Sequence, residues 1–203
     1  MTALLDSTAR PLDAASIDQL FRDAHTAYAF TSEDVSDAQL AELYDLVRHA
    51  PTALNSQPLR ITFIRSDEAK ARLLPHLAEM NRAKSQSAPV VAILSADTNF
   101  HENLDRTAPH MDNAKAKFAD DAARAQTAIT QGYLQAGYFI VAVRALGLDA
   151  GPMGGFDRDG IDAEFLGGTA QKSFLVVNIG HVAEDGNRPR QFRLDHDEAV
   201  TIL

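Results

Sequence analysis

The strongest constraint on the fold is a long helical segment predicted between residues 120 and 146. Its first half is polar, whereas the stretch "YLQAGYFIVAVRALGL", which begins at Tyr133, is apolar on nearly every side. A helix that is apolar all round is buried, either inside its own domain or against a second subunit. The apolar run is shorter than the ~20 residues that a membrane span needs, and it contains Gln135 and Arg144. We therefore expect a core or interface helix.

The segments around this helix predict an α+β fold. Capping boxes are predicted at Ser16 with Gln19 and at Ser36 with Gln39, each starting a helix. The first helix would run to about His25, and the second, with Leu40, Leu43, Tyr44 and Val47 on one face, would stop before Pro51. "RITFIR", "PVVAILSA" and "KSFLVVNIG" are typical of strands, and "DEAKARLLPHLAE" of a helix interrupted by proline. Helices between separated strands favour an α+β or three-layer arrangement.

Composition restricts the class of protein. The 203 residues show no linker or repeat, so we expect a single domain over residues 1–203, with a flexible arm at 1–15 that lacks the pattern of a signal peptide. A net charge of -9 argues against a nucleic-acid partner, and the lack of cysteine excludes disulfides and thiolate chemistry. A cytoplasmic protein with no membrane partner is the expectation. The irregular segment 97–118 predicts a lid or binding loop.

The stretch "LGLDAGPMGGFDRDG", residues 146–160, holds five glycines beside few polar side chains. Such backbone freedom predicts that something approaches the main chain closely. A dinucleotide-binding turn does not explain it, because the order Gly-Pro-Met-Gly-Gly differs from G-x-G-x-x-G and follows a helix. The remaining alternatives are a ligand that lies close to the backbone and a flexible turn from helix to strand.

Several polar groups are candidates for binding, each with a plainer alternative. The amides of Asn55 and Gln57 can pair with a heterocycle, or they serve a turn. Asn81 and Lys84 share a helix face, where a solvated helix end would look the same. Anion binding is suggested by His25 with Thr26 and by three arginines in "NRPRQFR", although an ordinary helix end and a solvated arm are the alternatives. "DHDEA" and "HENLDRTAPH" lack metal-ligand spacing, so solvated surface is favoured there.

In their order, "PTALNSQP", "NRAK", "RALGLDAGPMGGFD" and the arginine-bearing tail resemble the nitroreductase superfamily of FMN-dependent, NAD(P)H-using oxidoreductases. The resemblance runs from about Ala24 to the C-terminus. Within the superfamily, the chain looks most like the branch that contains malonic semialdehyde reductase of pyrimidine catabolism and many nitroreductase-like proteins.

The resemblance implies a set of cofactor-binding residues. The phosphate and ribityl chain would lie near the first segment and a pair of arginines in the tail, with Arg188 or Arg190 beside Arg193. The ring would contact the loop after Pro51, partly across a dimer interface. It would also contact Asn81 and Lys84 and the segment 152–155, which we call the glycine segment. The implied residues are His25, Thr26, Pro51, Thr52, Ala53, Asn55, Gln57, Asn81, Lys84, Pro152, Met153, Gly154, Gly155, Arg190 and Arg193.

The resemblance also implies a mainly antiparallel sheet between helices, in a homodimer that exchanges C-terminal arms, and a substrate-covering role for 97–118. NAD(P)H would deliver hydride to the flavin, and a small aldehyde, nitro or quinone acceptor would then take it. No side chain is assigned as catalytic. Ala24 and Tyr28 stand at positions that are often basic in relatives, and Gly154 stands where several have Glu. The alternatives are a flavin-binding or sequestering protein without fast turnover and a flavin-free dimeric scaffold.

Overall fold

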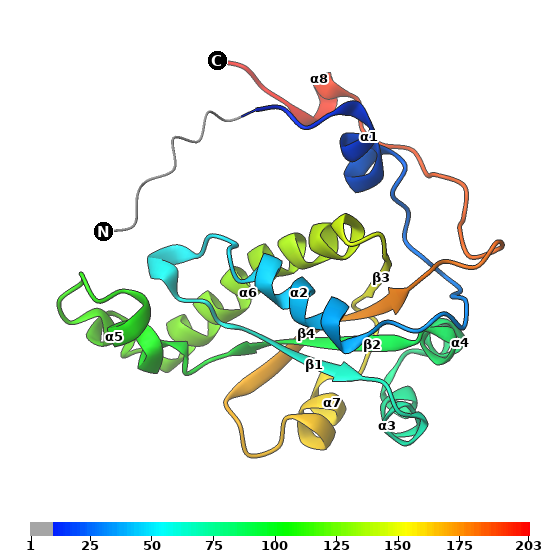
Figure 1. The fold of residues 1–203 in the computed structure, drawn as a ribbon. Helices are drawn as coiled ribbons and strands as arrows, with labels where there is room; N and C mark the ends of the chain where they lie inside the picture. The colour runs from blue at the N-terminus through cyan, green and yellow to red at the C-terminus, as the bar shows by residue number, and fades with distance from the viewer. Residues whose placement is uncertain (1–9) are drawn as a thin grey trace.

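The computed structural model describes residues 10–203, and its centre is one four-stranded antiparallel sheet (Figure 1). The strands are β1 (Leu59–Ile64), β2 (Val90–Asp97), β3 (Asp149–Met153) and β4 (Gln171–Gly180), in the order β1-β2-β4-β3. The α+β prediction and three of the strands are confirmed. The sequence did not reveal β3, because Gly151 and Pro152 are poor strand formers. Proline is tolerated there because β3 is an edge strand and needs fewer N–H donors.

Helices cover both faces of the sheet, which confirms the three-layer prediction (Figure 1). On one face, α2 (Asp37–Val47) and α6 (Asp121–Ala145) pack on alternate strand residues such as Ala92, Leu94 and Val177. On the other face, α3 (Asp67–Leu73) and α7 (Arg158–Phe165) pack on a second cluster that includes Ile93 and Val176. α4 (Glu79–Ser87) leads into β2. Two cores therefore hold the sheet between them.

The helix α6 is buried on one side only. Phe139 and Val143 have no exposed surface, and the buried Gln135 accepts a hydrogen bond from the backbone N–H of Leu59 at 3.0 Å. The opposite side forms a stripe of exposed residues at helical spacing, which we call the α6 stripe. Its members are Thr130, Tyr133, Leu134, Gly137 and Tyr138. Of the two predicted alternatives, complete burial of the helix inside its own domain is therefore wrong, and burial against a second subunit stays a prediction.

The start of the chain differs from the sequence prediction. α1 (Ala14–Ile17) begins at the N-cap Asp13, whose carboxylate accepts from the Ser16 backbone N–H at 2.7 Å, and a π-helical turn follows at Asp18–Arg22. The predicted capping box of Ser16 with Gln19 is wrong because Asp13, three residues earlier, supplies the cap. Of the predicted flexible arm, residues 1–9 lie outside the described part of the chain. The second box, Ser36 with Gln39, is confirmed.

Two irregular segments complete the molecule. Residues 97–118 form 3-10 turns at Phe100–Asn103 and Ala114–Phe118 around the short α5 (Leu104–Thr107), with the Phe100 and Phe118 rings 4.9 Å apart. The tail projects from the body and ends in α8 (His196–Ala199), as Figure 1 shows. "DHDEA" is the start of this helix, where Asp195 and Glu198 form a capping box. Over residues 10–203, every helix is too short or too polar to cross a membrane.

Candidate functional site

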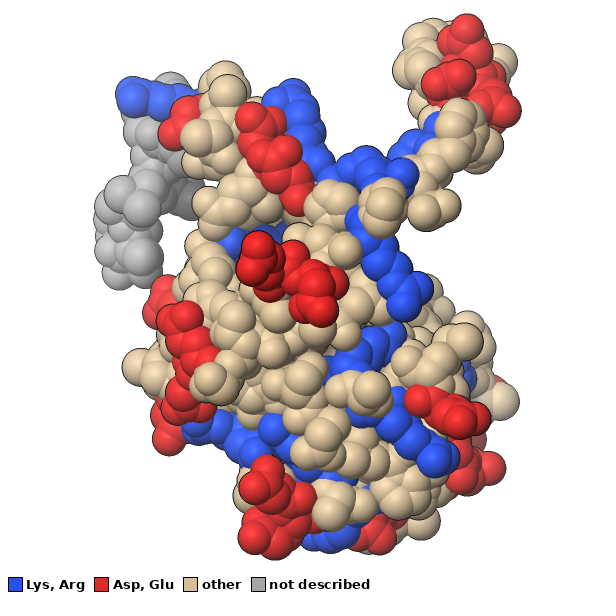
Figure 2. All heavy atoms as spheres, turned by 90° about the vertical axis from the view of Figure 1, so that its right-hand side faces the viewer, with Lys and Arg blue, Asp and Glu red and all other residues tan. Residues whose placement is uncertain are grey.

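A cavity of about 320 Å³ lies between the first segment and the C-terminal tail; we call it the arginine cavity. Four guanidinium groups line it, and no carboxylate belongs to its described lining. Figure 2 shows Lys and Arg side chains gathered in a band from the body to the base of the projecting tail. In a chain of net charge -9, such a concentration of cations favours an anionic ligand. The polar lining residues are His25, Thr26, Tyr28, Arg144, Arg188, Arg190, Gln191 and Arg193.

Backbone contacts fix the wall that contains His25 and Thr26. The Ala27 N–H donates to the Ala150 carbonyl of β3 at 3.1 Å. A Cβ at Gly151 would lie 2.7 Å from the Ala27 carbonyl oxygen, so only glycine allows this approach. Arg190 closes the wall from the tail, because its Nη2 donates to the carbonyls of Arg22 at 2.6 Å and Ala24 at 3.0 Å. At Gly151, what comes close to the backbone is the chain itself.

Tyr28 connects the arginine cavity to α4. The Arg188 guanidinium carbon lies 3.9 Å from the centre of the Tyr28 ring, and the Lys84 Nζ lies 5.1 Å from it. Both are cation–π distances. Partial burial and the nearby Arg188 charge lower the pKa of Lys84 below its usual value. Lys84 is therefore a partly desolvated cation beside further cations, an arrangement that an anion or an electron-rich ring edge would stabilise.

The glycine segment after β3 lies against α4. The buried side chain of Asn81 donates to the Gly155 carbonyl at 2.9 Å, and the Ala78 N–H donates to the same oxygen at 3.0 Å. A Cβ at Gly155 would lie 3.1 Å from Asn81 Nδ2, whereas a Cβ at Gly154 would have no heavy atom within 4 Å. Gly154 thus borders open space and Gly155 faces protein. Met153 is buried in β3 and Pro152 pairs with Val177.

The loop from Pro51 to Pro58 has an unusual backbone. Leu54, Asn55 and Gln57 have φ values of 55°, 51° and 44°, in the left-handed region that non-glycine residues seldom adopt. Tertiary contacts hold this conformation: the Ala53 N–H donates to Gln131 Oε1 at 2.8 Å, and Asn55 Nδ2 donates to the Thr107 carbonyl at 2.7 Å. Backbone strain of this kind is concentrated at functional sites. The Asn55 side-chain oxygen Oδ1 accepts a hydrogen bond from Gln57 Nε2 at 2.8 Å, so contacts within the chain already use much of the hydrogen-bonding capacity of these two side chains.

Within one chain, the predicted site residues fall into two groups. The arginine cavity, Asn81 and Lys84 lie at the end of the sheet where β2 begins, and the glycine segment, which lies at the end of β3, is joined to them through the contact of Gly155 with Asn81. The loop of Pro51 to Pro58 lies at the opposite end, where β1 begins and pairs with the end of β2 (Figure 1). Contacts within the chain connect the residues of the first group, and the second group is not joined to it.

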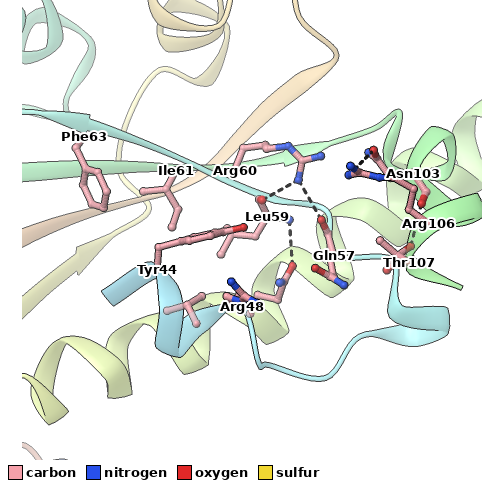
Figure 3. A pocket seen from close by; sticks show the side chains of 13 residues that line it. Tyr44, Arg48, Gln57, Leu59, Arg60, Ile61, Phe63, Asn103, Arg106 and Thr107 are labelled. Carbon is pink, nitrogen blue, oxygen red and sulfur yellow. Dashed lines mark hydrogen bonds between the residues drawn. The ribbon is translucent and has the colours of Figure 1, made fainter. Parts of the chain in front are cut away.

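A second cavity, of about 440 Å³, lies beside β1. In Figure 3, Tyr44 of α2, its C-cap Arg48, and Ile61 and Phe63 of β1 surround it. Arg60 donates to the carbonyls of Gln57 and Leu59. Tyr44, expected on the buried face of α2, is 54% exposed because it faces this cavity. In the sheet of residues 10–203, the outer edge of β1 has no neighbouring strand.

The fold is a four-stranded antiparallel sheet between helix layers, with a cationic cavity at one end. The fold superposes on a crystal structure described as a putative nitroreductase in complex with FMN from Exiguobacterium sibiricum. The TM-score is 0.82 at 19% identity, with 97% of this chain and 100% of that chain covered. This similarity establishes the nitroreductase fold.

Sequence comparison places the chain in a family. Residues 21–181 match the model of the Nitroreductase family, and the chain belongs to this family. A relative from Leptothrix cholodnii, named as a putative NADH dehydrogenase/NAD(P)H nitroreductase, is 50% identical over 95% of this chain and 98% of its own length. A Streptomyces coelicolor relative with the same kind of name is 51% identical over 95% and 98%. The resemblance found in the sequence is confirmed at the level of the family.

Among the polar residues that line the arginine cavity, sequence reasoning assigned Tyr28, Arg144 and Gln191 to no site, and the first two carry much of its chemistry. Arg144 counted only as a charge inside an apolar run, and Tyr28 only as a position where relatives are often basic. A signal for Arg144 was present, because a lone cation in the last turn of an apolar helix requires a polar environment. Nothing in the local sequence of Tyr28 indicated its two cationic neighbours.

Proposed function

We propose that the protein is an FMN-dependent NAD(P)H oxidoreductase that reduces a small electron-poor acceptor. One observation carries the proposal: in a member of the nitroreductase family, four arginines converge without a carboxylate on a cavity that Tyr28 connects to Lys84. FMN combines a phosphate with a flat ring, which fits a cationic cavity beside an accessible backbone. Family membership alone does not fix function, so the site must support it.

The residues present fit the cofactor. Among residues 10–203, the buried Arg144 Nε has no hydrogen-bond partner, and the open side of Gly154 leaves room for a ring against the main chain. Arg190, Arg193, His25 and Thr26 would hold the phosphate, and Lys84 would place positive charge at the polar edge of the ring. When bound, FMN supplies the hydride-transfer chemistry. The chain's part is to orient the ring, and Asn81 fixes the Gly155 carbonyl beside it.

A homodimer would complete the site. Pro51, Thr52, Ala53, Asn55 and Gln57 lie at the far end of the sheet from Lys84, so they would reach the ring only from a second copy. The α6 stripe supports this arrangement, since Tyr133, Leu134 and Tyr138 are 44–46% exposed and Gly137 permits close approach of another helix.

Arm exchange follows from the same arrangement. In the tail, Phe192, Leu194 and Ile202 are 76%, 64% and 84% exposed, which leaves much apolar surface uncovered. The free edge of β1 and the cavity of about 440 Å³ beside it provide a surface on which a tail segment can pair and pack. We propose that the tail of each copy docks there on the other.

The acceptor is proposed to be a small aldehyde such as malonic semialdehyde, or a nitro or quinone compound, with residues 97–118 covering it. The test is the visible spectrum of the purified protein. We expect flavin absorption that NAD(P)H bleaches and an acceptor restores. Bleaching without restoration by any acceptor would favour a flavin-sequestering protein, and a colourless protein that takes up no FMN would overturn the proposal.

A further inference from the structure

Arg144 differs from the other arginines of the cavity in origin. Arg188, Arg190 and Arg193 belong to the exposed tail, whereas Arg144 extends from the last turn of α6, which is anchored in the core. Its Nη1 donates to the Leu20 carbonyl at 3.1 Å. Its Nε is buried and has no acceptor among the described residues. The structure thus holds one guanidinium rigidly at the cavity with donors to spare.

Without a ligand, this arrangement lowers the stability of the folded protein. A guanidinium has five N–H donors and no acceptor, and a buried donor without a partner costs stability. Burial and the nearby Arg190 lower the pKa of Arg144, while Asp149 partly offsets this. Ala24 and Tyr28 bring no charge to the same wall. An anion with several acceptor oxygens would satisfy the free donors and offset the repulsion between the two guanidiniums.

We propose that Arg144 is a direct ligand of the cofactor's phosphate group and the anchor of the arginine cavity. The inference rests on the proposed function, since it takes FMN as the anion. A phosphate monoester presents three oxygens and close to two negative charges, which matches the planar fork of a guanidinium. Because α6 fixes Arg144 before the ligand arrives, the residue would contribute more than a tail arginine that must be ordered on binding.

The test compares two flavins that differ only in the phosphate. Apoprotein is titrated with FMN and with riboflavin, and binding is followed by quenching of flavin fluorescence. For Arg144→Met, the Kd for FMN is expected to rise by roughly 10- to 100-fold, the range for a hydrogen bond to a charged group. The Kd for riboflavin should change less than about twofold, because riboflavin has no phosphate. Inorganic phosphate should raise the Tm of the wild-type apoprotein more than that of the variant.

Gln19→Leu is the matched control. Gln19 Nε2 donates to the Arg144 carbonyl at 2.7 Å, so this variant loosens the same contact between α6 and residues 18–22 but keeps the guanidinium. We expect FMN binding by Gln19→Leu to match the wild type, and Arg144→Lys to bind with intermediate affinity because it keeps charge but not the fork. An equal loss of FMN and riboflavin binding in Arg144→Met, or the same loss in Gln19→Leu, would overturn the inference.

The design separates this inference from the proposed function. If the wild type prefers FMN to riboflavin and Arg144→Met keeps that preference, other residues hold the phosphate and only the role of Arg144 is wrong. If the wild type binds neither flavin, both proposals are wrong.

Discussion

Asn81 donates its side-chain amide to the carbonyl of Gly155, joining α4 to the segment after β3 across a separation of 74 residues in sequence. The amide is buried, so the bond is shielded from competition with water. It fixes the direction of a glycine backbone at the place where we propose the flavin ring lies. This one contact therefore links the stability of the apoprotein to the shape of the site.

Replacing Asn81 with Asp should destabilise the protein. The substitution keeps the shape but replaces an N–H donor with an oxygen that faces the Gly155 carbonyl, at a cost of about 1–3 kcal/mol in the free energy of unfolding. Urea denaturation measures the change. Ser85→Ala on the same helix is the control and should cost less, because its hydroxyl makes only a 3.8 Å contact with the Met153 sulfur. Equal losses would mean that packing, and not the hydrogen bond, sets the stability of α4.

Gly154 and Gly155 should respond to valine in opposite ways. Gly155→Val would press on Asn81 and Ala78, and overpacking of this kind costs about 1–3 kcal/mol of stability. Gly154→Val should fold within about 0.5 kcal/mol of the wild type, because a Cβ there meets nothing, but the side chain would occupy the proposed place of the ring. Flavin content and Tm of the two variants separate these effects. A Gly154→Val protein that retains full FMN would show that the ring does not lie there.

The α6 stripe predicts the oligomeric state. Leu134→Glu on this face should leave the fold intact but raise the dimer dissociation constant by at least roughly 100-fold, because both copies would bury an unpaired carboxylate. Sedimentation velocity measures the distribution of species. Ala122→Glu, at the exposed start of the same helix, is the control and should remain dimeric. A wild type that sediments as a monomer would contradict the composite site.

Lys84 should oppose stability in the apoprotein while favouring cofactor binding. Its pKa is lowered in the folded state, so the unfolded state holds the proton more tightly. The penalty is fully present at neutral pH and disappears as the pH rises toward the usual lysine value of 10.5. Lys84→Met should therefore raise the Tm of the apoprotein at pH 7 by about 1–2 °C, from roughly 0.5 kcal/mol after solvent screening.

The gain from Lys84→Met should shrink as the pH approaches 10, and the variant should bind FMN more weakly. Thermal unfolding across pH and flavin titration check the two effects. A loss of Tm at neutral pH would show that the contact of Lys84 with the Tyr28 ring outweighs its desolvation.

The sequence predicts well those elements that depend on residues close together in the chain, and poorly those that depend on contacts between residues far apart in the chain. Local signals were sufficient for α2, whose cap at Ser36 and buried Leu40, Leu43 and Val47 appear as predicted. They failed at β3, where Gly151 and Pro152 hide a strand that tertiary pairing with β4 creates. The first helix is capped three residues before the predicted N-cap Ser16, because Asp13 supplies the cap.

The candidate site was harder to predict than the fold. The family resemblance indicated His25, Lys84 and Arg190, but no local pattern places Arg144 beside them. Their meeting depends on contacts between residues more than a hundred positions apart, such as that between Gln19 and Arg144. No local pattern showed that the loop of Pro51 to Pro58 lies at the other end of the sheet, although the resemblance implied that part of it acts across a dimer interface.

The walls of the arginine cavity come from residues 24–28, from Arg144 and from residues 188–193, so both ends of the chain must be present to form it. A nascent chain leaves the ribosome from its N-terminus, and the tail arginines are among the last residues to emerge. The arginine cavity, where we propose that the phosphate binds, therefore forms only once synthesis is essentially finished. Cofactor loading in this protein would follow translation, and a chain truncated before residue 188 would fold its sheet without ever gaining a complete phosphate site.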